Sequence, residues 1–421
     1  MLRHSSSTAL TFRKKGLASA LAMAVALAGG TMAVSSVLVA PAAAQSYSRN
    51  FVSVYQPVAN VVNADGGDIS SVAGQFPAII AASVSADEQL ATGSLLLQAG
   101  IKASNPAWQR QGLEMQVNSG KLAPDTAAEF NYFIGRLAFD ARDYAGARAS
   151  LGRAAAAGYS APDLEGIIAD TYYQSGDVPS GLSYVREQVA RNAAAGRQTP
   201  EPLLLRALQA AYTARLNAES IDASEMLVKA HPTRDNWLRA LQVAMSIGDF
   251  DDGARLDLLR LMRVTNTLTE RGEYVAYIES ADPRIMSNEL DGVLTAAADA
   301  GLISRSDEYY EEVRAIIASR MAGDRADAPD LVADARRAAT GRDALAAGDV
   351  LYSLSDYAGA EEMYALAIQK GGVDNNTVLT RLGMMQAWQG KADEAQATLS
   401  QVSGERAIVA RMWAAYAATR G

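Results

Sequence analysis

The sequence contains no cysteine and only two histidines, His4 and His231. Without cysteine the chain cannot form disulfides, thiolate metal sites or a cysteine nucleophile, and it cannot carry the cysteine-linked lipid of a bacterial lipoprotein. Zinc sites built from several histidines are excluded as well. These absences remove many classes of metal-dependent and histidine-dependent enzyme, and we expect neither a metal nor a cofactor.

Positive charge is also in short supply. The chain has 38 Lys and Arg against 47 Asp and Glu, for a formal net charge of −9. Nucleic acids and anionic membrane surfaces are bound by clusters of Lys and Arg, so we expect neither as a partner. Beyond the N-terminal segment no apolar run is long enough to form a transmembrane helix.

The N-terminal segment, residues 1–44, has the features of a secretory signal peptide. Basic residues including Arg3 and Arg13 precede an apolar stretch over residues 16–40, and Ala42 and Ala44 fit the small-residue pattern cut by signal peptidase. We predict cleavage after Ala44 and export by the Sec route to the periplasm, or outside the cell, with no membrane anchor left. An uncleaved anchor is the alternative, because the apolar stretch could span a bilayer.

A spacing of 34 residues recurs along the chain. It separates Gly135 from Ala169 and Asp143 from Asp177. The sequence Asp-Tyr-Ala-Gly-Ala occurs at 143–147 and again at 356–360. A fixed period of this length predicts repeated helical hairpins, each too small to bury its apolar face alone, that stack to share one core.

Small residues mark both helices of each predicted hairpin. On the first helix they are Gly135, Ala169, Gly348 and Gly383, and on the second they are Ala147, Gly181, Gly253, Ala360 and Ala395. This pattern, with Trp237 and the turn aromatics Tyr144, Phe250 and Tyr357, resembles the tetratricopeptide repeat (TPR) family. The resemblance implies an all-α solenoid of stacked hairpins, and we expect an exported bacterial member. One departure is Asp257, which occupies a position where a large apolar residue is usual.

The remaining segments suggest the order of regions. We expect an N-terminal helical capping region at 45–120, TPR-like repeats at 121–264, an irregular helical region at 265–340, and further repeats with a C-terminal capping helix at 341–421. Residues 48–62 could be extended or helical. A polar loop is expected at 323–330, around Pro329, and the spacing of Ile408, Met412 and Tyr416 predicts an amphipathic final helix.

The resemblance also nominates residues for partner binding, because certain first-helix positions line the concave face in this family. Mapped onto this sequence they are Tyr132, Arg136, Phe139, Asp170, Tyr173, Gln242, Met245, Tyr352 and Trp388. Aromatic and Met side chains are good interface anchors. The alternative is that the periodic aromatics simply belong to the core.

These observations favour a non-catalytic scaffold of the bacterial cell envelope that binds a protein or peptide. Two alternatives stay open: a glycan-cleaving hydrolase or lyase on a helical toroid, with residues 309–312 as its best carboxylate and tyrosine candidates, and a structural subunit of a secretion or outer-membrane assembly. His231, which precedes Pro232 at a predicted helix end, is expected to be structural.

Overall fold

The computed structural model describes residues 47–420, and over that range the secondary structure is helical, without strands. The predicted signal peptide lies outside the described residues. Within them, no helix combines the length and the apolar character needed to cross a membrane. The chain divides into two compact units that meet in sequence after Gly181, and each is described by itself.

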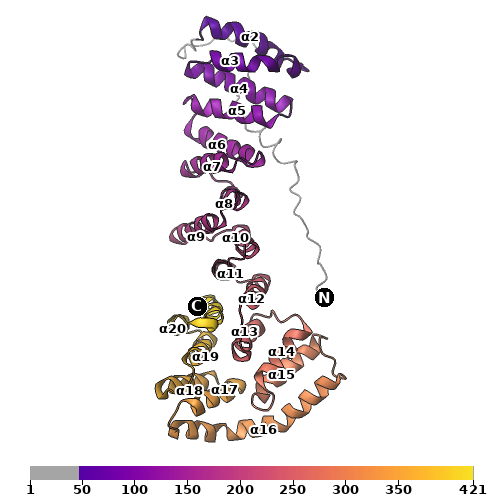
Figure 1. Ribbon diagram of the computed structural model, residues 1–421, viewed down its shortest axis with the longest axis vertical. Coiled ribbons are helices and arrows are strands. Elements are labelled where there is room, and N and C mark those ends of the chain that lie inside the picture. The colour runs from indigo at the N-terminus through magenta and orange to yellow at the C-terminus, as the bar shows by residue number, and fades with distance from the viewer. Residues whose placement is uncertain (1–46, 421) are drawn as a thin grey trace. The chain divides into compact units, whose positions relative to one another are not determined.

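Unit 1 is a stack of helices joined by short turns (Figure 1). Its helices are α2 (Arg49–Asn63), α3 (Phe76–Ala82), α4 (Ala86–Lys102), α5 (Pro106–Asn118), α6 (Pro124–Asp140), α7 (Tyr144–Ala156), α8 (Leu164–Gln174) and the start of α9 (Val178–Ala194). Two short 3₁₀ turns, Ile69–Ser71 and Ala73–Gln75, precede α3. Consecutive helices pack as hairpins, most extensively α4 with α5 and α6 with α7.

Residues 48–62, which the sequence allowed to be either extended or helical, largely form α2. Side chains of α4 bind both ends of this helix. Ser48 caps the N-terminus by accepting a hydrogen bond from the Phe51 amide at 3.2 Å. Glu88, in the first turn of α4, accepts the Ser48 amide at 2.8 Å. At the other end Lys102 donates to the Val62 and Ala64 carbonyls at 2.6 and 3.0 Å. The two charged side chains thus satisfy backbone groups at both ends of α2 that the helix itself leaves unpaired.

Acid should weaken this arrangement through Glu88. Amide hydrogen bonds from Ser48, and then from Ser85, lower the pKa of Glu88 from 4.5 to about 2. Because the folded-state pKa is the lower one, ionised Glu88 stabilises unit 1 above about pH 4.5, and this contribution is lost as the pH falls toward 2. We expect Glu88→Gln to remove that part of the pH dependence, measured by urea unfolding at a series of pH values. Asp125→Asn, at an exposed carboxylate on α6, is the control, and an unchanged pH profile in Glu88→Gln would contradict the assignment.

The repeated small residues lie where two helices of a hairpin approach most closely. A Cβ built on Gly135 of α6 would lie 2.5 Å from Leu151 Cγ of α7. In unit 2, Cβ atoms on Gly348 and Gly383 would lie 2.5 Å from Tyr364 Cε1 and 2.4 Å from Leu399 Cγ. In all three hairpins the large residue follows the glycine by 16 positions. Ala169, the fourth equivalent residue, is fully buried. The prediction of an all-α, TPR-like fold of stacked helical hairpins is confirmed.

A pair of substitutions in one hairpin tests this close approach. Gly135→Ala should destabilise unit 1 by about 1–3 kcal/mol, because its methyl group would overlap Leu151. Gly152→Ala, on the exposed side of α7 with no neighbouring atom within 4 Å, should be stabilising by roughly 0.5–1 kcal/mol. Urea unfolding followed by circular dichroism measures both values. Equal effects at the two positions would show that the hairpin does not depend on the small residue.

Unit 2 continues the hairpins and then returns to its own beginning. Its helices are α10 (Glu201–Thr213), α11 (Asn217–Ala230), α12 (Arg234–Ile247), α13 (Asp252–Val264), α14 (Arg271–Ala281), α15 (Ser287–Asp299), α16 (Glu308–Arg337), α17 (Arg342–Ser353), α18 (Tyr357–Lys370), α19 (Asn375–Trp388), α20 (Ala392–Leu399) and α21 (Ala407–Ala418), with a 3₁₀ turn at Gly404–Arg406. The final helix packs against α11, α12 and α13 as well as against its neighbours α19 and α20 (Figure 1). One hydrophobic core therefore runs from α11 to α21.

The last helix is more deeply buried than its sequence suggests. The expected stripe is present, since Met412 is fully buried and Tyr416 is 7% exposed. However, Trp413, Ala414 and Ala415 are buried too, so α21 lacks the wide solvent-facing side of a terminal cap. The helix is covered because it is enclosed between the first and last helices of unit 2.

The prediction of a polar loop at residues 323–330 is wrong. These residues are helical, and α16 runs without interruption past Pro329. Proline lacks a backbone N–H and normally costs about 3 kcal/mol inside a helix. The cost is offset by good helix formers on both sides and by packing, because Ala328 and Ala335 are buried while α16 contacts both α15 and α17. Tertiary contacts have overridden a local signal.

Candidate functional site

Tyr132 and Arg136, two of the predicted partner-binding residues, form a polar cluster in unit 1. The Tyr132 hydroxyl donates to Asp163 at 2.8 Å, and Arg136 pairs with the same carboxylate at 2.5 Å. Tyr132 is only 8% exposed. Burial, followed by the bond to Asp163, raises the pKa of Tyr132 to about 12. The phenol therefore stays protonated at neutral pH and orients the carboxylate that joins α6 to the turn before α8.

The other three predicted residues of unit 1 are half-buried on α6 and α8. Phe139 packs edge-on against Tyr144, with ring centroids 5.7 Å apart. Tyr173 covers Gly181, where an added Cβ would lie 2.4 Å from its ring. Asp170 lies one turn earlier on α8. These aromatic residues thus support the hairpins, while part of each side chain still reaches solvent, and partner contact by all three remains a prediction.

In unit 2 the predicted residues divide into two groups. Gln242 is exposed on α12, and Met245 is half-buried against the core. Tyr352 and Trp388, which are 36 positions apart, line the same cavity. Of the four predicted residues in unit 2, the cavity brings together only this pair, at the C-terminal ends of α17 and α19.

The cavity has a volume of about 180 Å³. It is lined by the C-terminal ends of α13, α17 and α19 and by the first turns of α15 and α18. Aromatic rings form one wall: Tyr357 stacks on Trp388 with centroids 4.9 Å apart and planes 11° apart, and Tyr352 lies 5.9 Å from Tyr357. An aromatic wall beside polar side chains is a common composition for a binding pocket.

Charged residues complete the lining. Glu289 is buried, and its carboxylate is held by Arg260 at 2.9 and 2.8 Å and by the Tyr277 hydroxyl at 2.6 Å. The Ser353 hydroxyl oxygen accepts the Glu289 amide at 2.9 Å. Arg263 also lines the cavity, but it forms no ion pair with any residue in the described part of the chain. Glu289, Ser353 and Arg263 follow no periodic pattern, so the sequence did not indicate them as lining residues.

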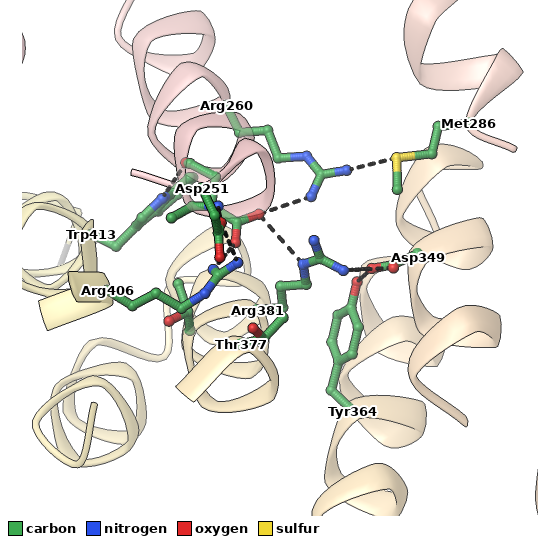
Figure 2. Close-up of polar contacts among 12 residues, drawn as sticks. Asp251, Arg260, Met286, Asp349, Tyr364, Thr377, Arg381, Arg406 and Trp413 are labelled. Carbon is green, nitrogen blue, oxygen red and sulfur yellow. Dashed lines mark hydrogen bonds and ion pairs between the residues drawn. The ribbon is translucent and has the colours of Figure 1, made fainter. Parts of the chain in front are cut away.

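Behind the cavity lies a buried network of charges centred on Asp257. This carboxylate pairs with Arg260 at 3.1 Å, Arg381 at 3.4 Å and Arg406 at 2.6 Å. Figure 2 shows the three guanidinium groups converging from α13, α19 and the turn before α21. Arg381 also pairs with Asp349 at 2.6 Å. Three buried arginines therefore meet two buried carboxylates, Asp257 and Glu289, and the part-buried Asp349, so the network is close to neutral.

Backbone and aromatic contacts fix the network in place. The Trp413 indole N–H donates to the Asp257 carbonyl at 2.8 Å, and Arg260 lies 4.2 Å above the Tyr352 ring. A Cβ on Gly253 would lie 2.7 Å from Arg406 Nη2, so a larger residue there would require that guanidinium to shift. The small residue that the repeat pattern requires at 253 thus also serves the charge network.

The carboxyl group of Asp257 is ionised despite its burial. Burial raises its pKa, but Arg381, Arg260 and Arg406 together outweigh burial and hold the pKa below the ordinary value of 3.8. Asp257, which occupies a position where the repeat family usually has a large apolar residue, is therefore the centre of the buried charge network. The sequence showed that an aspartate at position 257 was unusual, but it did not show the three arginines that pair with it.

The cavity lining does not contain the two carboxyl groups that the glycan-cleaving alternative requires. Glycoside cleavage needs two carboxyl groups about 5–10 Å apart on either side of the bond. Only Glu289 lines the cavity as a carboxylate, and both of its oxygens are already bonded. Glu311 and Glu312 are exposed on α16. His231 ends α11, and its Nε2 is 2.7 Å from the Thr199 carbonyl oxygen, which agrees with a structural role.

No cluster of metal-ligating side chains occurs among residues 47–420. Asp68, in the polar turn after α2, caps a 3₁₀ turn, where its carboxylate accepts the Ser70 amide at 3.0 Å. Local hydrogen bonds therefore explain the Asp68 carboxylate.

Two solved structures that are similar to this chain are distant neighbours. No protein-family model matches the sequence, and no curated protein matches it. The structure of Naa15/Naa10 bound to HypK-THB is 13% identical, with a TM-score of 0.26 over 81% of this chain and 61% of that one, so this chain spans less than two thirds of its length. A tetratricopeptide repeat protein from Parabacteroides merdae is 9% identical, with a TM-score of 0.23 over 69% of this chain and 98% of the other.

Substitution of Asp257 tests the network. Asp257→Asn leaves three buried guanidinium groups without their central anion, and we expect unit 2 to lose about 3–5 kcal/mol in free energy of unfolding. Asp235→Asn is the matched control, because the Asp235 side chain is 75% exposed and lies 3.9 Å from Arg234. The control should change stability by less than about 0.5 kcal/mol. Denaturant unfolding measures both, and similar small effects would show that the network contributes little.

Proposed function

We propose that this protein is a non-catalytic, exported scaffold of the bacterial cell envelope that binds a protein partner through the solvent-reaching side chains of its first helices. The observation that carries the proposal is the cavity of unit 2, where the partly exposed rings of Trp388, at the end of a first helix, and Tyr357 stack beside the buried Tyr352. Aromatic side chains that are held rigidly and partly exposed are the residues that most often anchor protein interfaces.

Two further features support a binding role. Helical hairpins stacked in series offer long surfaces suited to peptides or partner domains. The cavity is also smaller than the roughly 300–1,000 Å³ typical of pockets that enclose a whole metabolite or drug-sized ligand, so it fits one anchoring group of a larger partner. Export rests on the sequence features of residues 1–44, and we propose the periplasm as the place of action.

In-cell photocrosslinking tests both parts of the proposal. A photoreactive residue at Ser355, exposed at the rim of the cavity, or at Gln242 should yield crosslinks to a defined protein. The same residue at Glu312, exposed on α16, is the positional control. The mature chain, recovered from the envelope fraction, should begin at Gln45 by mass spectrometry. An intact N-terminus in a cytoplasmic fraction would overturn the location.

Substitution of the aromatic wall gives a second measure. Trp388→Ala should lower the yield of the Ser355 crosslink several-fold, because the anchor for the partner is lost. Tyr212→Ala, at an aromatic residue 44% exposed on α10, should leave the yield unchanged. Identical products at Ser355, Gln242 and Glu312, or no products at any of them, would contradict the scaffold proposal.

A further inference from the structure

Arg263 is the one charged residue of the cavity lining that forms no ion pair with any described residue, although it is hydrogen-bonded to Tyr277 and lies near Glu289. It lies in the last turn of α13, and its guanidinium rests over Gly292 of α15, where an added Cβ would be 2.9 Å from Nη2. A part-buried arginine usually meets a carboxylate or phosphate, because removing its charge from water is costly. The position of Arg263 therefore leaves room for an anion supplied from outside the chain.

The neighbouring charges do not fill this role. Glu289 is the carboxylate of the lining, and Arg260 and Tyr277 bind its oxygens from the side of the buried network. Burial opposes the charge of Arg263, while Tyr277, Tyr352 and Glu289 favour it, so that its pKa is raised above its ordinary value. The guanidinium remains fully charged at every physiological pH.

The size and walls of the cavity limit what the anion can be. A cavity of about 150 Å³ is known to hold one benzene molecule, so 180 Å³ accepts a group of that size. The rings of Tyr352, Tyr357 and Trp388 favour a flat or apolar body next to the charge. The Ser355 side chain lies at the exposed rim and offers a further hydroxyl.

We propose that the cavity is a carboxylate-binding site in which Arg263 pairs with the carboxylate and the aromatic wall packs against the short body that carries it. The ligand is either a free small organic acid or an acidic side chain of the partner. The second source rests on the proposed scaffold function, whereas the first does not. In both, the guanidinium fork supplies two parallel donors to the carboxylate oxygens.

Binding to the purified protein, residues 45–421, tests the shared chemistry. Isothermal titration with sodium benzoate should give a dissociation constant on the order of millimolar. Benzamide, of the same shape without the charge, should bind at least about tenfold more weakly, as expected when a charged hydrogen bond is lost. N-acetylglutamate amide against N-acetylglutamine amide repeats the comparison for a peptide side chain. Tighter binding of benzoate points to a free acid, and tighter binding of the glutamate compound points to a partner.

Substitutions at Arg263 test whether the acid binds to this residue. Arg263→Gln should weaken the binding of the preferred acid by at least about tenfold, and Arg263→Lys should retain an intermediate affinity, since it keeps the charge and loses the fork. Arg255→Gln, at an exposed arginine on the same helix, is the matched control and should bind like the wild type. Circular dichroism checks that each variant is folded.

The proposal fails if neither acid binds, if the neutral compounds bind equally well, or if folded Arg263→Gln binds like the wild type. Should Arg263→Gln not fold, a crystal of the wild type soaked with benzoate decides, because the carboxylate must lie on Arg263. Loss of crosslinking at Ser355 with intact benzoate binding would overturn the scaffold function and leave this site standing.

Discussion

The pairing of one buried aspartate with three arginines is the constraint on which unit 2 depends. In a simple repeat array each hairpin contacts only its neighbours. Here Arg406 reaches Asp257 across 149 positions of sequence, and Trp413 reaches it across 156. Because a guanidinium taken out of water is costly unless it is paired, the charges hold α13, α19 and the 3₁₀ turn before α21 together. A stack of local units thereby becomes one cooperative body.

The same network prepares the cavity. Arg260 links Asp257 to Glu289 and lies on the ring of Tyr352, so two residues of the cavity lining are fixed from behind. A site held by such a supporting layer keeps its geometry without waiting for a ligand. The network also consumes every oxygen of Glu289, which leaves Arg263 as the charge that the cavity presents. The structural role of the buried charges and the chemistry of the cavity are therefore connected.

The repeat period predicted the hairpins because the contact it reports is local. A glycine facing a large residue 16 positions later leaves a mark in any stretch of sequence long enough to contain both. The packing of α21 against α11–α13 produces no such sequence pattern, since the residues in contact are far apart in the sequence and follow no period. The sequence therefore indicated that Asp257 was unusual without showing why. It placed Tyr352 and Trp388 correctly on first helices and missed Arg263, whose role depends on helices that do not repeat.

The charges at the centre of unit 2 select one relative placement of its helices, which apolar residues would select less strictly. Its core holds many alanines among the larger side chains, and surfaces of alanine allow several helix registers of similar energy, because each presents nearly the same methyl groups. A leucine at position 257 would be buried equally well in many of them. Three arginines and three carboxylates neutralise one another only when α13, α15, α17 and α19 adopt one relative placement. Every slipped arrangement leaves an unpaired buried charge, which is far more costly than an imperfect apolar contact. The network therefore acts chiefly by penalising the alternatives.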